Sequence, residues 1–391
     1  MVKPFQFSSI PRIYFKCGSL ATLPSLIKTY GNSVILVTSK LSFIDSVYAG
    51  SLFQKFKDEG IKYQTVIIEN EPSPDVIDQN VNKLKEELFN AVVGIGGGSI
   101  LDAGKAISAM MYKDDSVLGY LEGVGTKEHP GTKLPFIAVP TTSGTGSEAT
   151  KNAVISRVGK DGFKRSLRHE NFVPNIAVVD PELTMSCPPA LTAASGMDCF
   201  TQLTEAYLSD KSNEYTDTLA IEGLKAIKTS LVASVVNGQD LEARTGMSFA
   251  ALTSGICLAN AGLGVVHGFA SSIGGRYNIP HGVICGTLMS VSNELTVRKL
   301  RQEPDNQVAL KKYAFLGKLF LNEEGKSDDH YIAGFVNYLH NLTNTLKLPG
   351  LKELGIKEDD LIKIALNTEC KNNSVKLETD DLIELLTKRF I

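Results

Sequence analysis

The sequence predicts an α/β half that contains a parallel sheet, followed by a half that is all helical. In the first 180 residues, short β-branched runs alternate with stretches of helical apolar spacing. Beyond Asp180 the strand-like runs nearly vanish, and long apolar-periodic segments replace them. The chain has 391 residues and is 43% hydrophobic. It is therefore long enough to bury two cores.

The first half is expected to form strands separated by helices. Strand-like runs cover residues 33–38, 63–68, 91–95 and 135–139, and helix-like stretches cover 51–60 and 75–90. Strands that alternate with helices imply a parallel sheet with helices packed on its faces.

The second half is expected to be helical. Apolar-periodic segments cover residues 190–208, 219–236, 241–261 and 380–390. Ser186-Cys187-Pro188-Pro189 is a natural chain break before a helix. The predicted domains are therefore 1–184 and 185–391. Charged patches around 323–329 and 369–373 are expected to be solvated loops.

Composition disfavours several classes of partner. The net charge of −3 provides no basic field for nucleic acid or an anionic membrane. Six scattered cysteines, without a C-x-x-C pair, suggest core thiols in a reducing compartment. No run approaches the roughly 20 apolar residues of a membrane span, and the first residues do not resemble a signal peptide. A cytoplasmic location is therefore expected.

A glycine-rich turn directly follows the apolar run at 91–95. Gly96-Gly97-Gly98-Ser99 opens a helical stretch that carries Asp102 and Lys105. Glycines let the backbone approach a ligand, and a helix N-terminus offers N–H groups and a positive dipole end to a pyrophosphate. An ordinary strand-to-helix turn needs one or two glycines, so three in a row favour a phosphate site.

A hydroxyl-rich turn follows the run at 135–139. Residues 140–148, Pro-Thr-Thr-Ser-Gly-Thr-Gly-Ser-Glu, carry five hydroxyls within nine positions, which can bond phosphate, ribose or a nicotinamide amide. The alternative is a capping loop in which Thr145 or Ser147 is an N-cap. Both turns follow strands, so both are expected at the carboxyl edge of the sheet, where such folds bind ligands. Together they indicate a dinucleotide.

Four polar residues of the second half suggest a metal site. Asp198 and Gln202 are four positions apart, which places both on one face of a predicted helix. His267 and His281 follow in apolar surroundings. One carboxylate and two imidazoles suit zinc, iron or nickel, and an amide oxygen is a weaker fourth donor. The alternative for either histidine is a hydrogen-bonded structural residue.

These motifs share the order and spacing of a known family. Gly97-Gly98-Ser99-x-x-Asp102-x-x-Lys105, residues 140–148, Asp180-Pro181-Glu182-Leu183-Thr184, Gly196-Met197-Asp198, and His267 to Pro280-His281-Gly282 resemble the iron-containing alcohol dehydrogenases. The resemblance runs from about residue 10 to 300. It implies a dinucleotide-binding α/β domain, an all-helical domain and a metal-containing substrate cleft between them, an architecture shared with dehydroquinate synthases.

The resemblance also implies roles for individual residues. The nucleotide is expected to contact Gly97, Gly98, Ser99, Asp102, Thr141, Thr142, Thr145, Ser147 and Lys164, the last through its ribose. Asp198, His267 and His281 match the family's metal ligands. Iron is the metal that the family implies, although zinc or nickel would also suit these donors.

Three positions depart from the family pattern. Gln202 stands where the fourth metal ligand is normally histidine. Ser271 stands where many relatives have a histidine that relays a proton, so the proton would pass through water, the Ser271 hydroxyl or the ribose. Ser39 stands where NAD-preferring relatives often carry aspartate, and beside Lys40 it would tolerate a 2′-phosphate. NAD and NADP both fit, with a slight preference for NADP.

The expected function is that of an NAD(P)-dependent, metal-dependent alcohol dehydrogenase or aldehyde reductase for a small alcohol or aldehyde. The expected role of the metal is to polarise the substrate oxygen, with His267 and Ser271 as the catalytic side chains. The alternatives are a metal-free reductase of an activated carbonyl, as in maleylacetate reductases, a dehydroquinate synthase-like lyase, a non-catalytic nucleotide-binding relative, and an oxygen-activating iron site. The resemblance implies a homodimer or larger homo-oligomer.

Overall fold

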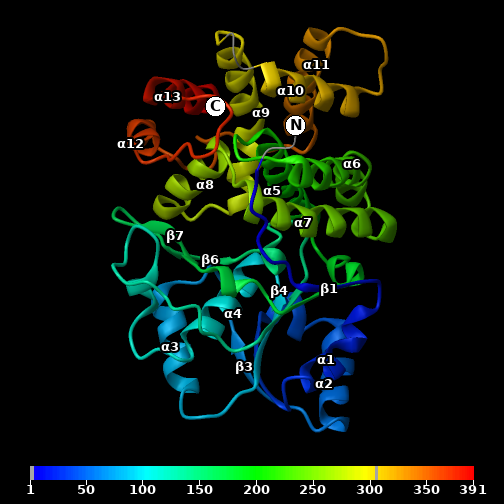
Figure 1. The fold of residues 1–391 in the computed structure, drawn as a ribbon, viewed down its shortest axis with the longest axis vertical. Coiled ribbons are helices and arrows are strands. Elements are labelled where there is room, and N and C mark those ends of the chain that lie inside the picture. Colours follow the sequence, from blue (N-terminus) through cyan, green and yellow to red (C-terminus); the bar gives the residue numbers. More distant parts are fainter. Residues whose placement is uncertain (1–3, 304–306) are drawn as a thin grey trace.

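The computed structural model describes residues 4–303 and 307–391 and divides into two stacked halves. An α/β half lies at the bottom of Figure 1 and a helical half at the top, with a β-hairpin beside their junction. This arrangement confirms the fold class predicted from the sequence.

The sheet of the first half is entirely parallel, with strand order β1-β8-β5-β4-β2-β3. Its strands are β1 (Arg12–Phe15), β2 (Ser33–Thr38), β3 (Lys62–Ile67), β4 (Ala91–Gly96), β5 (Phe136–Pro140) and β8 (Ile176–Val179). The chain leaves β2 toward β3 on one side, but β4 lies on the other side. The crevice between the carboxyl ends of β2 and β4 is therefore the topological switch point, where doubly wound sheets bind ligands.

Helices cover both faces of this sheet. They are α1 (Leu23–Lys28), α2 (Val47–Asp58), α3 (Pro74–Leu84) and α4 (Gly98–Met110). Successive β2 side chains point to opposite faces. Ile35 packs in the core shared with α3 and α4, whereas Leu36 packs in the core shared with α1 and α2. This two-sided burial explains why the central strands β2, β4, β5 and β8 are almost continuously apolar.

An antiparallel hairpin, β6 (Asn152–Arg157) and β7 (Phe163–Arg168), was not expected from the sequence. Charged residues dominate β7, so its alternation is weak as a strand signal. The hairpin lies beside α8 and contributes to the junction of the two halves (Figure 1).

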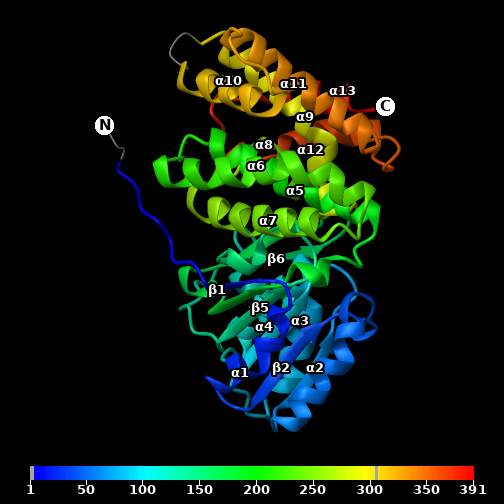
Figure 2. The same cartoon turned by 90° about the vertical axis from the view of Figure 1, so that its right-hand side faces the viewer.

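The second half consists of helices. They are α5 (Pro189–Leu208), α6 (Glu214–Val236), α7 (Leu241–Ala261), α8 (Val265–Arg276), α9 (His281–Leu300), α10 (Gln307–Leu321), α11 (Asp328–Thr345), α12 (Leu361–Leu366) and α13 (Thr379–Lys388). Figure 2 shows α7 next to the α/β half, with α5 and α6 beyond it and α10 and α11 farthest away. Residues 323–327 of the charged patch fall in the exposed connection between α10 and α11, as expected, whereas Asp328 and Asp329 are the exposed first residues of α11.

Short helical turns complete the chain. They are η1 (Ser19–Thr22), η3 (Val117–Tyr120), η4 (Ser147–Ala149), η5 (Glu170–Phe172), η6 (Pro181–Thr184) and η7 (Glu358–Asp360), with a π-helical turn η2 (Lys40–Ile44). In the described part of the chain, no single helix is long and apolar enough to cross a membrane. The pair α7 and α8, bent by 98° at its junction, meets the length and composition criteria only when taken together.

Close backbone contacts join the two halves. A Cβ at Gly255 of α7 would collide with the carbonyl oxygen of Gly146, and a Cβ at Gly146 would collide with the Gly255 backbone. Gly146 also has a φ of 61°, which favours glycine. A Cβ at Gly144 would come within 2.8 Å of Ser195 Cβ. Small residues on both sides therefore let the hydroxyl-rich turn sit directly on α5 and α7.

Candidate nucleotide and metal site

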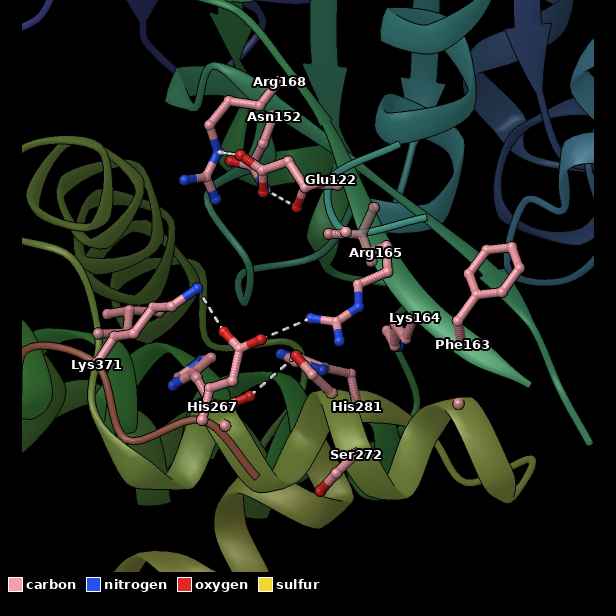
Figure 3. Close-up of a pocket in the computed structure, with 18 of the residues that line it drawn as sticks. Glu122, Asn152, Phe163, Lys164, Arg165, Arg168, His267, Ser272, His281 and Lys371 are labelled. Carbon is pink, nitrogen blue, oxygen red and sulfur yellow. Dashed lines mark hydrogen bonds and ion pairs between the residues drawn. The ribbon is translucent and has the colours of Figure 1, made fainter. Parts of the chain in front are cut away.

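A cavity of about 1130 Å³ lies between the two halves. The α/β half contributes Gly98, Ser99 and Lys164 to its wall, and the helical half contributes His267 and His281. Figure 3 shows the side chains of β7 on one side of this space and those of α8 and α9 on the other. The predicted phosphate turn and three of the four predicted metal ligands, Gln202, His267 and His281, therefore open on the same cavity.

The glycine-rich turn connects β4 to α4 at the switch point. Gly97 is the N-cap of α4, and no side chain caps the helix there. A Cβ on Gly98 would come within 2.7 Å of Thr145 Oγ1, and a Cβ on Gly97 within 3.3 Å of Thr142 Oγ1. The two turns predicted to bind the nucleotide thus pack against each other, and the free N–H groups of α4 suit a phosphate.

Asp102 ties this turn to its surroundings. Its Oδ1 accepts a hydrogen bond from Ser147 Oγ at 2.5 Å, and its Oδ2 accepts one from the Val154 N–H at 3.0 Å. Asp102 and Ser147 also line the cavity. Asp102 therefore braces the hydroxyl-rich turn and the hairpin from the cavity wall.

Beneath this wall, Lys105 is fully buried. Its ammonium donates to Ser147 O at 2.9 Å, Thr150 Oγ1 at 2.9 Å and Asn152 O at 2.7 Å. Burial lowers the pKa of Lys105 to about 8, against the opposing effect of the nearby Asp102 carboxylate. Lys105 thus stabilises the turn from below.

Lys164 projects from β7 into the cavity. It forms an ion pair with Glu71, which also accepts a hydrogen bond from Ser156 Oγ at 3.0 Å. Burial favours the protonated Glu71 carboxyl, but the charge and hydrogen bond of Lys164 outweigh it and lower the Glu71 pKa. Lys164 is thereby held in the cavity wall, the place from which a ribose contact is expected.

Some of the residues predicted to bind the nucleotide line the cavity, and four do not. Among the described residues, that wall includes Gly98, Ser99, Asp102, Thr145, Ser147 and Lys164, but not Ser39, Gly97, Thr141 or Thr142. Ser39 directly follows β2 and is the N-cap of the η2 turn, where its Oγ accepts a hydrogen bond from Ser42 N–H at 3.1 Å. It lies at the switch point rather than in the cavity itself.

The structure brings Asp198, His267 and His281 together. Asp198 Oδ1 is 3.2 Å from His267 Nε2 and 3.6 Å from His281 Nε2. The Asp198 side chain is 2% exposed. One carboxylate and two imidazoles that converge on one point form a donor set suited to a divalent metal. These residues therefore fit the metal that the resemblance implies.

The charge states of Asp198 and His281 also suit a cation. Burial opposes ionisation of Asp198, but the nearby His281 and the hydrogen bond from His267 outweigh it and lower its pKa to about 2. Burial lowers the pKa of His281 to about 4. An ionised carboxylate and a neutral imidazole are the forms that bind a metal.

Glu205 holds His267 from its other side. Glu205 Oε2 is 2.6 Å from His267 Nδ1, and Glu205 Oε1 accepts a hydrogen bond from the Val266 N–H at 2.7 Å. A carboxylate on the far nitrogen fixes the ring of a metal-binding histidine and leaves Nε2 for the metal. Sequence reasoning missed Glu205, although its position seven residues after Asp198 on α5 puts it near the same helix face.

Cys285 also joins the cluster and was missed in the sequence. Asp198, His267, His281 and Cys285 each offer one ligand atom, and these atoms all lie within 4.8 Å of one another. Cys285 lies one helical turn after His281 on α9, a spacing that could have revealed it.

Gln202 lies beside Asp198, but its amide oxygen is engaged elsewhere. Gln202 Oε1 accepts a hydrogen bond from Ser254 Oγ at 3.1 Å, and Gln202 Nε2 lies 3.5 Å from Asp198 Oδ1. The other departure, Ser271, lines the cavity one turn after His267 and donates to the His267 carbonyl at 3.1 Å.

The charged patch at 369–373 is more than the solvated loop expected from the sequence. Glu369, Lys371 and Asn372 line the cavity, and Glu369 Oε1 accepts a hydrogen bond from Arg165 of β7 at 3.1 Å. Tertiary contact with the hairpin thus makes this loop part of the cavity wall.

Comparisons with known proteins agree with this geometry. Residues 11–181 match the family profile "Iron-containing alcohol dehydrogenase", and residues 192–390 match "Fe-containing alcohol dehydrogenase family, C-terminal". Alcohol dehydrogenase 4 of Saccharomyces cerevisiae is 32% identical over 387 residues, which cover 97% of each chain. The NAD-dependent methanol dehydrogenase of Bacillus methanolicus is 31% identical, with 81% of each chain covered.

A solved structure supports the same assignment. The structure of an archaeal halo-thermophilic alcohol dehydrogenase from a Red Sea brine pool superposes with a TM-score of 0.91 at 26% identity, covering 100% of this chain and 99% of the other. The family and its NAD-dependent members support a nucleotide cofactor and a metal. The chain belongs to the iron-containing alcohol dehydrogenase family and is an oxidoreductase that acts on CH–OH groups.

Proposed function

We propose that this chain is an NAD(P)- and metal-dependent enzyme that interconverts a small alcohol and its aldehyde. One observation carries the proposal: His267 and His281, which cluster with Asp198, open on the same cavity as the start of α4 at Gly98. A phosphate site and a metal-type site that share one space allow a dinucleotide and a small substrate to meet there.

Each part of the site has a task in this proposal. A divalent cation held by Asp198, His267 and His281 would polarise the substrate oxygen, while hydride transfer is the chemistry of the nicotinamide. The N–H groups at the start of α4 would hold the pyrophosphate. The enclosing walls of both halves would orient the two reactants and exclude water.

Ser271 is proposed to hold the proton that moves to or from the substrate oxygen. Its hydroxyl lines the cavity one helical turn from His267, and its bond to the His267 carbonyl orients Oγ. A hydroxyl can accept one hydrogen bond while it donates another, so Ser271 can join a relay with water or the cofactor ribose.

A metal-free reductase is the second candidate, and the cluster argues against it. Asp198 is 2% exposed and lies among imidazoles, and a buried carboxylate is costly unless a cation or strong hydrogen bonds balance it. The hydrogen bond from His267 offsets part of this cost. A bound divalent cation would offset more.

Elemental analysis of protein purified without chelator tests the metal. We expect about one metal per chain in the wild type, and loss of both metal and alcohol oxidation in Asp198→Ala and His267→Ala. His330→Ala is the matched control, because His330 is exposed near the start of α11 and belongs neither to the cavity wall nor to the cluster. A wild type without metal that still reduces aldehydes would favour the metal-free candidate. A wild type that binds a nucleotide but oxidises or reduces nothing in an alcohol and aldehyde panel would indicate a non-catalytic relative.

A further inference from the structure

The helical half places a thiol next to the three metal-type side chains. Asp198 comes from α5, His267 from α8, and His281 and Cys285 from successive turns of α9. Cys285 is fully buried, and its Sγ lies 3.8 Å from His267 Nε2. The sulfur therefore faces the same point as the carboxylate and the imidazoles.

The spacing of these atoms matches that of a four-coordinate metal. Tetrahedral bonds of about 2.0 Å to nitrogen and oxygen and about 2.3 Å to sulfur separate nitrogen from oxygen by about 3.3 Å, and nitrogen from sulfur by about 3.5 Å. The observed separations are 3.2 Å and 3.6 Å from Asp198 to the two histidines, and 3.8 Å from His267 to Cys285. The four groups are already arranged for one ion.

Unlike Cys285, Gln202 has its potential metal-binding atom engaged in a hydrogen bond outside the cluster. Its oxygen, the atom that could bind a metal, accepts a hydrogen bond from Ser254, and its nitrogen is the amide atom that lies near Asp198. Coordination through Oε1 would require this amide to rotate and the Ser254 bond to break. Gln202 is thus placed to orient the Asp198 carboxylate.

We propose that Cys285 supplies the fourth protein ligand of the metal, and that Gln202 is a positioning residue for Asp198. The inference rests on the metal of the proposed function and concerns only its ligand set. The Cys285 Sγ–H proton passes to solvent as the metal–sulfur bond forms. Because thiolate sulfur is a soft donor, this set favours zinc over iron.

Cobalt(II) absorption tests this assignment independently of activity. Sulfur bound to cobalt produces a charge-transfer band in the near ultraviolet that oxygen and nitrogen donors do not produce. We expect this band in cobalt-loaded wild type and in Gln202→Ala, and its loss in Cys285→Ser. We also expect at least about tenfold weaker cobalt binding in Cys285→Ser. Cys257→Ser is the matched control, because Cys257 is a buried thiol of the same helical half that contacts Thr216.

X-ray absorption spectroscopy of zinc-loaded wild type tests for the metal–sulfur bond without the need for a variant. A sulfur neighbour at about 2.3 Å is expected. A shell of only nitrogen and oxygen, or a cobalt band that persists in Cys285→Ser, overturns the assignment. If wild type binds cobalt without the band, and Asp198→Ala abolishes binding, the Cys285 assignment fails while the proposed function stands. If wild type binds neither cobalt nor zinc, both fail.

Discussion

At the scale of single residues, the metal-type cluster depends on side chains that do not bind the metal themselves. Glu205 accepts hydrogen bonds from both the ring and the neighbouring backbone of the His267 segment. Burial opposes the charged His267 ring, but the nearby Cys285, the Glu205 carboxylate and the hydrogen bond with Asp198 outweigh it and raise the His267 pKa well above its usual value. In a metal-loaded site the same carboxylate would fix the ring and make Nε2 a stronger donor.

Replacing Glu205 with glutamine should therefore weaken metal binding. We expect a loss of about 10-fold to 100-fold in affinity, because the neutral amide orients the ring less firmly and no longer increases its basicity. Competition with a chromophoric chelator measures the affinity. Glu214→Gln, at an exposed position on α6, is the control and should bind normally. Equal affinities for wild type and Glu205→Gln would show that Glu205 does not support the ligand.

Lys133 should make stability depend on pH. It donates to Val173 O at 2.6 Å, and burial lowers its pKa to about 7. The unfolded chain, with an ordinary lysine pKa of 10.5, therefore binds more protons between about pH 7 and 10.5, so stability rises with pH in that window. For one such group, the free energy of unfolding rises within this window by about 1.4 kcal/mol per pH unit.

Comparison with Lys133→Met isolates this contribution from those of other titrating groups. Between pH 7 and pH 9 the wild type should gain stability relative to the variant, measured as the midpoint of urea unfolding. A difference between wild type and Lys133→Met that does not change with pH would show that the folded protein keeps Lys133 charged.

Ser39 should influence the choice between NAD and NADP. It directly follows β2 at the switch point, and aspartate would keep its capping role while adding a negative charge. Repulsion of a 2′-phosphate by about 1–4 kcal/mol should lower kcat/KM for NADP at least about fivefold and leave that for NAD nearly unchanged. Steady-state kinetics of Ser39→Asp with both cofactors measures this, with Ser39→Asn as the uncharged control. An equal change for both cofactors would place Ser39 away from the 2′ position.

At the scale of secondary structure elements, a few helices position most of the cluster. Asp198, Gln202 and Glu205 lie near one face of α5, and Cys285 follows His281 by one turn on α9. The proposed ligand Asp198, its positioning residue Gln202 and the His267 partner Glu205 thus share one rigid helix, which helps to preserve their geometry. The β6–β7 hairpin completes the cavity from the opposite side, through Lys164.

The contact between α7 and the hydroxyl-rich turn is a second element-scale feature. A methyl group in Gly255→Ala would meet the Gly146 carbonyl, so α7 and the turn must separate. Overpacking of this kind should cost about 1–3 kcal/mol and weaken nucleotide binding by displacing the turn. Thermal unfolding and nucleotide titration measure the two effects.

Gly50→Ala is the matched control for this substitution. Gly50 lies exposed within α2, and nothing lies within 4 Å of an added Cβ. Alanine there should stabilise the protein by about 0.5–1 kcal/mol, because glycine is a poor helix former. If Gly255→Ala proved as stable as Gly50→Ala, the two halves would not depend on the close backbone contact.

At the scale of the whole molecule, the cavity needs both halves, since neither half contains the phosphate turn and the metal-type cluster together. A nucleotide that binds only the folded chain should raise the free energy of unfolding by about 2.7 kcal/mol at 100 times its Kd. In Gly98→Ala the added Cβ would lie 2.7 Å from Thr145 Oγ1, so the same NADP or NAD concentration should stabilise this variant much less. Differential scanning fluorimetry measures the shift, and Gly50→Ala should retain it in full. A full shift in Gly98→Ala would place the phosphate elsewhere.

Much of the molecule could be predicted from its sequence. The apolar runs at 33–38 and 91–95 became buried parallel strands, the segment 241–261 became α7, and Asp198, His267 and His281 converged. The hairpin of residues 152–168 was missed because its charged β7 strand lacks the apolar alternation of a half-buried strand. The division at residue 184 and the homo-oligomer remain predictions.

The sequence by itself determined the fold class, the phosphate turn and three of the metal-type residues, because each depends on local spacing that a linear pattern records. Only the tertiary structure decided that Glu205 supports His267, that Cys285 faces Asp198, and that Glu369 meets Arg165 of β7. These contacts join positions on different helices and halves. Their geometry is set by packing of the whole chain, which residue order along one segment does not specify.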